Sequence, residues 1–301
     1  MSRVVVVGAG FAGMAAVREL RESGAQVTLV DRHIHSTFQL LLYQIATGGL
    51  NPGDIVYPVR NFVRRYGARF HRGSVPAIDA QARELVVDDG AHLGYDYLLL
   101  ASGVTTNYFG VPGAAEHSMP LYTRREAIVV RDCLMAGLET LAARGGTEDL
   151  TAVIVVGGGA TGVETADALA ELRNAAVKTA FPEITPGQVN NIVLLEQGPE
   201  LLAPYPSQLR RYALAQLRKR GVQVRLDTPV REVTPDTVTV GDNTMLRADL
   251  TIWAAGVTAA AGVYEWGLPQ GRGGRIIVDD HLRVASHPDV FAAGDLALID
   301  G

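Results

Sequence analysis

Cysteine is nearly absent from this sequence, in which Cys133 is the only one among 301 residues. A single cysteine cannot form a disulfide within the chain. It excludes disulfide reductases, which need a redox cysteine pair, and sulfide-oxidising enzymes, which need cysteines too. We expect Cys133 to be a small buried hydrophobe on a helix over 124–141. His33 and His35 have no further ligands clustered with them in the sequence, so no metal site is predicted.

Long apolar runs and an excess of basic charge are also missing. No stretch reaches the roughly 18 apolar residues needed to cross a bilayer. The chain begins directly with a strand-like run, so we expect no signal peptide and a cytoplasmic location. With 27 basic and 32 acidic residues, the net charge of −5 argues against a nucleic-acid partner. The length and the 48% apolar content indicate a soluble protein of two domains.

Glycine, by contrast, is abundant, and one glycine pattern occurs twice. A short apolar run, at 4–7 and again at 153–156, leads into three glycines spaced G-x-G-x-x-G. These glycines are Gly8, Gly10 and Gly13 in the first copy and Gly157, Gly159 and Gly162 in the second. Helix-like stretches follow at 14–20 and 163–172, and the next apolar run ends in Asp31 or Glu196.

Each part of this pattern has a physical reason. The first glycine permits a tight turn from strand to helix, the second lets the backbone approach a pyrophosphate, and the third lets the helix pack close to the strand. The helix N-terminus offers free N–H groups to the phosphates, and the acid can accept hydrogen bonds from ribose hydroxyls. One such pattern is a weak signal because glycine-rich turns are common. Two copies, each between a strand and a helix, predict two adenine-dinucleotide sites.

The repeat extends beyond the glycines. Residues 69–103 and 222–256 both read as a strand, an alternating meander and a buried strand ending in Ala-x-Gly. We therefore predict an α/β protein with two Rossmann-like dinucleotide-binding domains, each a three-layer ββα fold with a small antiparallel meander.

At this point the sequence resembles the single-subunit type II NADH dehydrogenases, which are non-pumping NADH:quinone oxidoreductases within the two-dinucleotide-binding flavoproteins. The resemblance rests on four segments and covers essentially the whole chain. They are FQLLLYQIATGGL at 38–50 with PVR at 58–60, GGGATGVE at 157–164, the proline-containing insert at 174–191, and VFAAGD at 290–295. Leu40 stands where the family usually has proline.

The resemblance implies a discontinuous FAD-binding domain, 1–120 plus 258–301, and an NADH-binding domain, 121–257. It also implies a further C-terminal segment in family members that closes the flavin site, lines the quinone tunnel and carries the membrane anchor. We therefore expect a truncated chain with weakened FAD binding. We also expect a parent protein that is peripheral on the cytoplasmic face of the membrane and can form a homodimer.

For FAD, the resemblance implies contacts along the first copy and at a few later positions. Asp31 and Arg32 would face the adenosine, Val75 the adenine edge, and Asp295 the ribityl chain, although Asp295 is also a candidate helix N-cap. Thr47 would lie beside the isoalloxazine, and Tyr43 and Gln44 near the quinone, unless 40–45 is simply packed in the core. The remaining FAD contacts are Gly8, Gly10, Phe11, Ala12, Gly13, Ala101, Ser102 and Gly103.

For NADH, the resemblance implies contacts along the second copy. Glu196 favours NADH over NADPH because a carboxylate repels a 2′-phosphate. Glu164 would touch the nicotinamide, or alternatively serve as a first-turn carboxylate favoured by the helix dipole. Ala255 and Gly256 would line the nicotinamide pocket. The other contacts are Gly157, Gly159, Ala160, Thr161 and Gly162.

The sequence thus predicts an FAD-dependent enzyme that takes hydride from NADH and passes two electrons to a quinone. The residues with catalytic roles would be Glu164, Thr47 and Gln44, with no metal. Two alternatives stay open at this stage: a ferredoxin- or rubredoxin-type NADH reductase, and a nucleotide-binding fragment without turnover.

Overall fold

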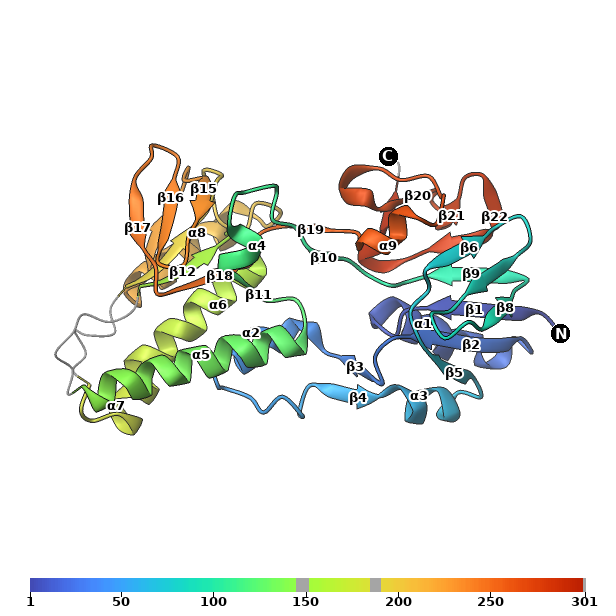
Figure 1. Cartoon of the computed structure of the whole chain (residues 1–301), viewed down its shortest axis with the longest axis horizontal. Helices are drawn as coiled ribbons and strands as arrows, with labels where there is room; N and C mark the ends of the chain where they lie inside the picture. Colours follow the sequence, from blue (N-terminus) through green and yellow to red (C-terminus); the bar gives the residue numbers. More distant parts are fainter. Residues whose placement is uncertain (145–151, 185–190, 300–301) are drawn as a thin grey trace. The chain divides into compact units, whose positions relative to one another are not determined.

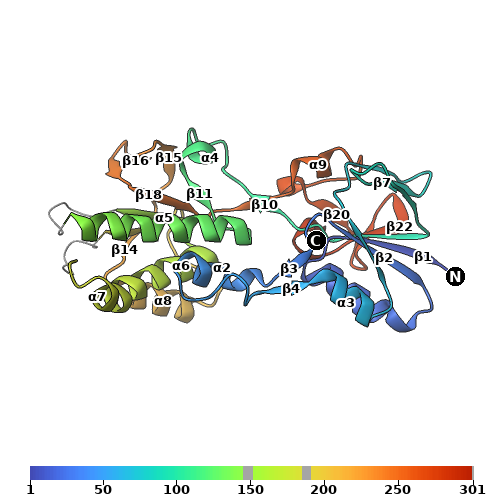
Figure 2. The same cartoon turned by 60° about the horizontal axis from the view of Figure 1, so that its bottom comes forward.

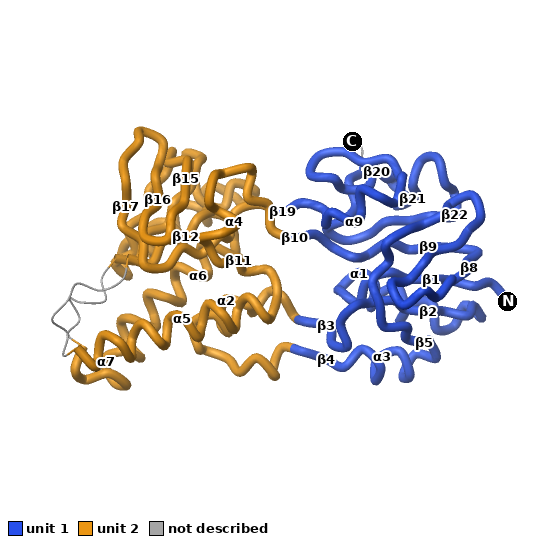
Figure 3. Tube along the Cα trace, viewed as in Figure 1, with its two compact units in different colours: residues 1–37, 56–105, 257–301 blue, residues 38–55, 106–256 orange. Residues whose placement is uncertain are grey.

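The computed structural model describes residues 1–144, 152–184 and 191–299. These residues form two compact units, coloured separately in Figure 3. Unit 1 comprises Met1–Thr37, Val56–Thr105 and Val257–Gly301, and unit 2 comprises Phe38–Ile55 and Thr106–Gly256.

Unit 1 is built on an eight-stranded sheet in the order β23-β20-β21-β22-β9-β1-β2-β5. Its central strands are parallel, and β21 pairs antiparallel with both of its neighbours. The strands are β1 (Arg3–Val7), β2 (Gln26–Asp31), β5 (Arg69–Arg72), β9 (Tyr97–Leu100), β20 (Ile276–Val278), β21 (Arg283–Val284), β22 (His287–Ala292) and β23 (Ala297–Ile299).

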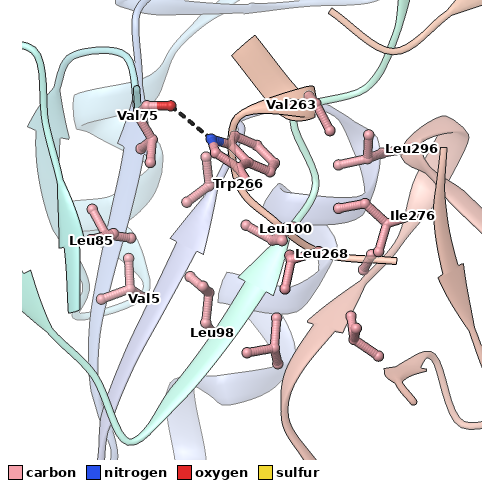
Figure 4. Close-up of a cluster of buried hydrophobic side chains, with 14 of the residues drawn as sticks. Val5, Val75, Leu85, Leu98, Leu100, Val263, Trp266, Leu268, Ile276 and Leu296 are labelled. Carbon is pink, nitrogen blue, oxygen red and sulfur yellow. Dashed lines mark hydrogen bonds between the residues drawn. The ribbon is translucent and has the colours of Figure 1, made fainter. Parts of the chain in front are cut away.

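Alternating side chains of β1 bury both faces of this sheet. Val4 and Val6 pack with helices α1 (Phe11–Glu19) and α3 (Val59–Arg65). Val5 and Val7 pack on the other side with the meander and with Trp266, as Figure 4 shows for part of this cluster. The meander strands are β6 (Ala77–Asp79), β7 (Glu84–Val86) and β8 (His92–Gly94); β6 and β8 are labelled in Figure 1. The remaining elements are β3 (His35–Thr37), β4 (Val56–Pro58), α9 (Ala261–Tyr264) and three 3₁₀ helices, Leu20–Glu22, Arg272–Gly274 and Gly294–Leu296.

Unit 2 repeats this plan with a five-stranded parallel sheet in the order β11-β18-β12-β13-β14. One face packs against helices and the other against a second meander. The sheet strands are β11 (Met119–Pro120), β12 (Val153–Val156), β13 (Ile192–Leu195), β14 (Gln223–Arg225) and β18 (Leu250–Trp253), and the meander strands are β15 (Val230–Val233), β16 (Thr237–Val240) and β17 (Met245–Arg247). The helices are α2 (Leu42–Ala46), α4 (Ala114–His117), α5 (Arg124–Ala143), α6 (Ala160–Glu171), α7 (Val177–Ala180) and α8 (Ser207–Lys219), with a 3₁₀ turn at Gln39–Leu41 and a π turn at Leu172–Ala176. Two short strands, β10 (Thr105–Thr106) and β19 (Val257–Thr258), pair where the chain passes between the units.

The strand registers confirm the internal repeat. Val7 pairs with Val30, the residue before Asp31. Val156 pairs with Leu195, the residue before Glu196. Each acid therefore lies at the carboxyl end of the strand next to its glycine loop. The predicted three-layer α/β fold is correct.

The unit boundaries differ from the predicted domain limits, because 38–55 and 106–120 belong to unit 2. Leu42 and Ile45 of α2 are buried in the core of unit 2, and α2 lies alongside α5 and α6 in Figure 2. Residues 38–55 therefore belong to unit 2 because α2 packs in its core, although the residues before and after this segment belong to unit 1.

The predicted helix over 124–141 is α5, which begins with a capping box between Thr123 and Glu126. Its buried stripe comprises Ala127, Val130, Leu138 and Leu141. Cys133 lies beside this stripe and is exposed, so the prediction that it is buried was wrong. No helix in the described ranges is both long and apolar enough to span a membrane. The described residues also contain no group of three or more potential metal ligands.

Candidate functional site

The two glycine loops have nearly identical geometry. Gly8 has a φ of +109° and Gly157 a φ of +111°, values that only glycine adopts readily. The N–H of Gly8 donates to the Val30 carbonyl at 2.8 Å, and that of Gly157 donates to the Leu195 carbonyl at 2.8 Å. Each loop is thereby attached to the neighbouring strand at the carboxyl end of its sheet.

The third glycine of each loop allows the helix to lie against the turn. A Cβ at Gly13 would lie 1.9 Å from the carbonyl oxygen of Gly8. A Cβ at Gly162 would lie 1.8 Å from that of Gly157. Both distances are far below van der Waals contact, so these two positions require glycine for packing.

The second glycine of each loop faces open space. A Cβ at Gly10 or Gly159 would meet no atom within 4 Å, and both residues are exposed. Each is also the N-cap of its helix, without a side-chain cap and without an acid in the first turn. Phe11 and Ala12, or Ala160 and Thr161, begin the helices. An open approach to uncapped helical N–H groups fits the pyrophosphate of FAD or NADH.

The acids hold the loops in the same way in both units. The Asp31 carboxylate accepts the N–H groups of Ala9 and His33, each at 2.6 Å. The Glu196 carboxylate accepts those of Gly158 at 2.6 Å and Gly198 at 2.7 Å. Each oxygen keeps a lone pair for a ribose hydroxyl. Ala9 and Gly158 were missed in the sequence, although both occupy the middle of Gly-x-Gly.

Other residues predicted to contact FAD gather around the first loop. The Ala101 N–H donates to Val7 at 2.7 Å, and the Ala101 carbonyl would lie 2.2 Å from a Cβ at Gly8. Ser102 and Gly103 continue from there, with Gly103 at a φ of +70°.

Two more predicted FAD contacts lie in unit 1: Arg32 directly after β2, and Val75 between β5 and β6. The carbonyl of Val75 accepts the indole N–H of Trp266 at 3.0 Å (Figure 4). Trp266 thus fixes the backbone segment that was predicted to meet the adenine. Arg32 is exposed, and its Nε donates to His33 at 3.1 Å.

Asp295 is exposed beside the start of α1. A Cβ at Gly294 would lie 3.2 Å from the Cβ of Ala12, which places this turn against the helix N-terminus. The N-cap of the turn is Ala293, so the alternative that Asp295 is an N-cap was wrong. The side chain of Asp295 is exposed and can therefore face a ligand at the first loop.

Residues 38–50 place Gln44 and Thr47 in unit 2. The Thr47 hydroxyl is buried and donates to the Tyr43 carbonyl at 2.9 Å. The Gln44 amide folds over Gly49, where a Cβ would lie 2.2 Å from its Oε1. Core packing therefore accounts for Leu42 and Ile45, whereas Tyr43 and Gln44 stay half-buried.

Glu164 is the fifth residue of α6 and lies beyond the first turn, so the first-turn interpretation was wrong. Partial burial raises the pKa of its carboxyl above the ordinary value, and no charged partner among the described residues offsets this. A carboxyl with a raised pKa near a nucleotide loop is a candidate functional group.

This raised pKa predicts a pH-dependent effect of Glu164→Gln. Because the folded-state pKa lies above the unfolded value, ionisation of Glu164 opposes folding as the pH rises past its ordinary pKa. We expect Glu164→Gln to raise the melting temperature modestly at neutral pH and much less at about pH 4, where the carboxyl is mostly protonated in both the folded and the unfolded state. Glu171→Gln, at the end of the same helix, is the control. An equal shift at both pH values would contradict this explanation.

Ala255 and Gly256 follow β18, next to the glycine loop strand β12. The Ala255 carbonyl accepts the indole N–H of Trp253 at 2.9 Å. Gly256 has a φ of +66°. The predicted NADH contacts of unit 2 thus share the carboxyl edge of one sheet.

Comparisons with known proteins agree with this geometry. The model of the pyridine nucleotide-disulphide oxidoreductase family matches residues 2–300. Type II NADH:quinone oxidoreductase NdhA of Mycobacterium tuberculosis is 33% identical over 99% of this chain and 67% of its own length. Type II NADH:quinone oxidoreductase of Haemophilus influenzae is 30% identical over 99% of this chain and 74% of its own length.

Solved structures show the same fold. NDH2 of Plasmodium falciparum in complex with NADH superposes with a TM-score of 0.89 at 22% identity, covering 99% of this chain and 64% of that one. The sulfide:quinone oxidoreductase of Aquifex aeolicus gives 0.83 at 19% identity, covering 99% of this chain and 69% of that one. The chain thus spans about two thirds of these relatives. From its family match and its similarity to NdhA, the chain belongs to the pyridine nucleotide-disulphide oxidoreductases and, within them, to the type II NADH:quinone oxidoreductases.

Proposed function

We propose that this chain is the two-nucleotide portion of an FAD-dependent NADH:quinone oxidoreductase, with FAD on unit 1 and NADH on unit 2. The observation that carries this proposal is the duplicated loop, in which an open glycine, an uncapped helix and an oriented acid recur. Two such sites suit one cofactor that remains bound, FAD, and one nucleotide that binds and dissociates in each cycle, NADH. FAD, when bound, supplies the two-electron chemistry that links NADH to a quinone.

The protein contributes binding and orientation. In unit 1, the N–H groups at Gly10–Gly13 would receive the pyrophosphate, Asp31 the ribose and Asp295 the ribityl hydroxyls. In unit 2, Gly159–Gly162 and Glu196 would do the same for NADH. Thr47, Gln44 and Glu164 stay proposals as catalytic residues, with Glu164 the strongest because its pKa is raised. Peripheral attachment to the cytoplasmic face of a membrane and homodimer formation are proposals for the whole protein.

Glu196 predicts a preference for NADH. We expect Glu196→Gln to reduce the discrimination against NADPH by roughly tenfold, because removing the charge removes repulsion of a 2′-phosphate, and about 1.4 kcal/mol corresponds to tenfold. The amide oxygen can still accept one of the two N–H groups now bound by Glu196. Competition titrations of NADH and NADPH measure the ratio. An unchanged ratio in a folded variant would remove Glu196 from nucleotide selection.

An acceptor screen tests the proposed reaction. The FAD-reconstituted chain is supplied with NADH and, in parallel, a short-chain ubiquinone, a menaquinone analogue, a ferredoxin and ferricyanide. We expect ferricyanide and a quinone to be reduced and the ferredoxin not. Faster reduction of the ferredoxin than of either quinone would favour a ferredoxin-type reductase, and NADH binding without turnover of any acceptor would favour a nucleotide-binding fragment.

A further inference from the structure

Phe109 combines two features that core packing does not explain. Its side chain is 59% exposed, and its backbone has a φ of +53°. The left-handed region is uncommon for a bulky residue and costs about 1–3 kcal/mol. Because burial of the ring does not offset this strain, ligand binding is the candidate explanation for why the backbone holds Phe109 in this conformation.

Hydrogen bonds hold Phe109 in this conformation. The side-chain oxygen of Asn107 accepts the Phe109 N–H at 2.8 Å. The Asn107 N–H donates to the Gly256 carbonyl at 3.2 Å, and the Asn107 carbonyl accepts the Trp253 indole N–H at 2.9 Å. These hydrogen bonds attach the backbone of the turn to the end of β18.

The ring lies directly against Gly256. A Cβ at Gly256 would be 2.1 Å from Cζ and 2.4 Å from Cε2 of Phe109. Only glycine permits this approach. Ala255 and Gly256 are the residues at which the resemblance places the nicotinamide, and they follow the strand adjacent to β12, which leads into the second glycine loop.

We propose that Phe109 forms a wall of the NADH site and positions the nicotinamide ring by aromatic contact. The inference rests on the proposed function, since it requires NADH to bind unit 2. An exposed ring at the end of β18 offers a flat apolar surface that a planar nicotinamide can contact. ADP-ribose has no nicotinamide ring and so cannot make this contact. Strain is repeatedly found at such ligand contacts. Phe109 is therefore a positioning residue for the nicotinamide.

Calorimetric titration of the full chain with NADH and with ADP-ribose tests this role. We expect Phe109→Leu to weaken NADH binding roughly 3- to 10-fold, the range of one aromatic contact, and to leave ADP-ribose binding unchanged. Phe109→Tyr keeps the ring and should bind NADH like the wild type. Tyr212→Leu removes a 64% exposed aromatic ring from α8 of the same unit and is the control.

Comparing NADH with ADP-ribose distinguishes failure of the proposed role of Phe109 from failure of the proposed function. Unchanged NADH affinity in Phe109→Leu, or an equal loss for NADH and ADP-ribose, would overturn the role of Phe109 while leaving the site in unit 2. If the wild type bound neither ligand, the proposed function itself would be refuted, and the role of Phe109 with it.

Discussion

Alanine at Gly10 is expected to leave unit 1 folded and to deprive it of FAD, and alanine at Gly159 to do the same to unit 2 and NADH. No atom lies within 4 Å of the added methyl group in either case, and neither residue has a positive φ. The methyl group would instead occupy the space in front of the helix N–H groups. Loss of one or two charge-assisted hydrogen bonds, worth about 1.5–3 kcal/mol each, weakens binding on the order of 100-fold.

Two further alanine variants serve as matched controls. Gly262 in unit 1 and Gly137 in unit 2 also have no atom within 4 Å of an added Cβ, and they lie on α9 and α5, outside the glycine loops. Flavin content after reconstitution and NADH titration provide the readouts. Normal FAD and NADH binding in the Gly10→Ala and Gly159→Ala variants would show that these loops do not hold the pyrophosphates.

Alanine at the third glycine is expected to act on stability. In Gly13→Ala or Gly162→Ala the methyl group would meet a backbone carbonyl oxygen at 1.9 or 1.8 Å. Backbone cannot rotate away as a flexible side chain can, so the helix must move off the strand. We expect a loss of at least about 3 kcal/mol, at the upper end of overpacking effects.

Urea unfolding followed by circular dichroism measures this loss. Gly137→Ala and Gly262→Ala again serve as controls, with midpoints equal to the wild type or slightly higher. A wild-type midpoint for Gly162→Ala would mean that α6 does not pack on its loop as the structure describes.

The duplicated fold could be predicted from sequence because local signals agree with one another. Residues 4–7 and 153–156 are β-branched runs, and each is followed directly by the first glycine of a G-x-G-x-x-G pattern. The role of that glycine can be recognised from the next five residues. The acids follow at the end of the next strand, and the register of β1 with β2 matches that of β12 with β13.

The remaining features depend on contacts distant in sequence. Cys133 was expected to be buried from residue type alone, yet its position on α5 puts it beside the buried stripe. Residues 38–55 join unit 2 because α2 packs on helices far along the chain. The contact between Phe109 and Gly256 joins residues far apart in the sequence, and no local sequence pattern predicts it.

The most direct test of two cooperating nucleotide sites is the anaerobic absorption spectrum of the FAD-reconstituted chain before and after addition of NADH. The account predicts a bound flavin band near 450 nm that bleaches with NADH in the wild type, is absent in Gly10→Ala, and is present but resistant to NADH in Gly159→Ala. A chain that takes up no flavin, or a bound flavin that NADH reduces equally in the wild type and Gly159→Ala, would contradict it.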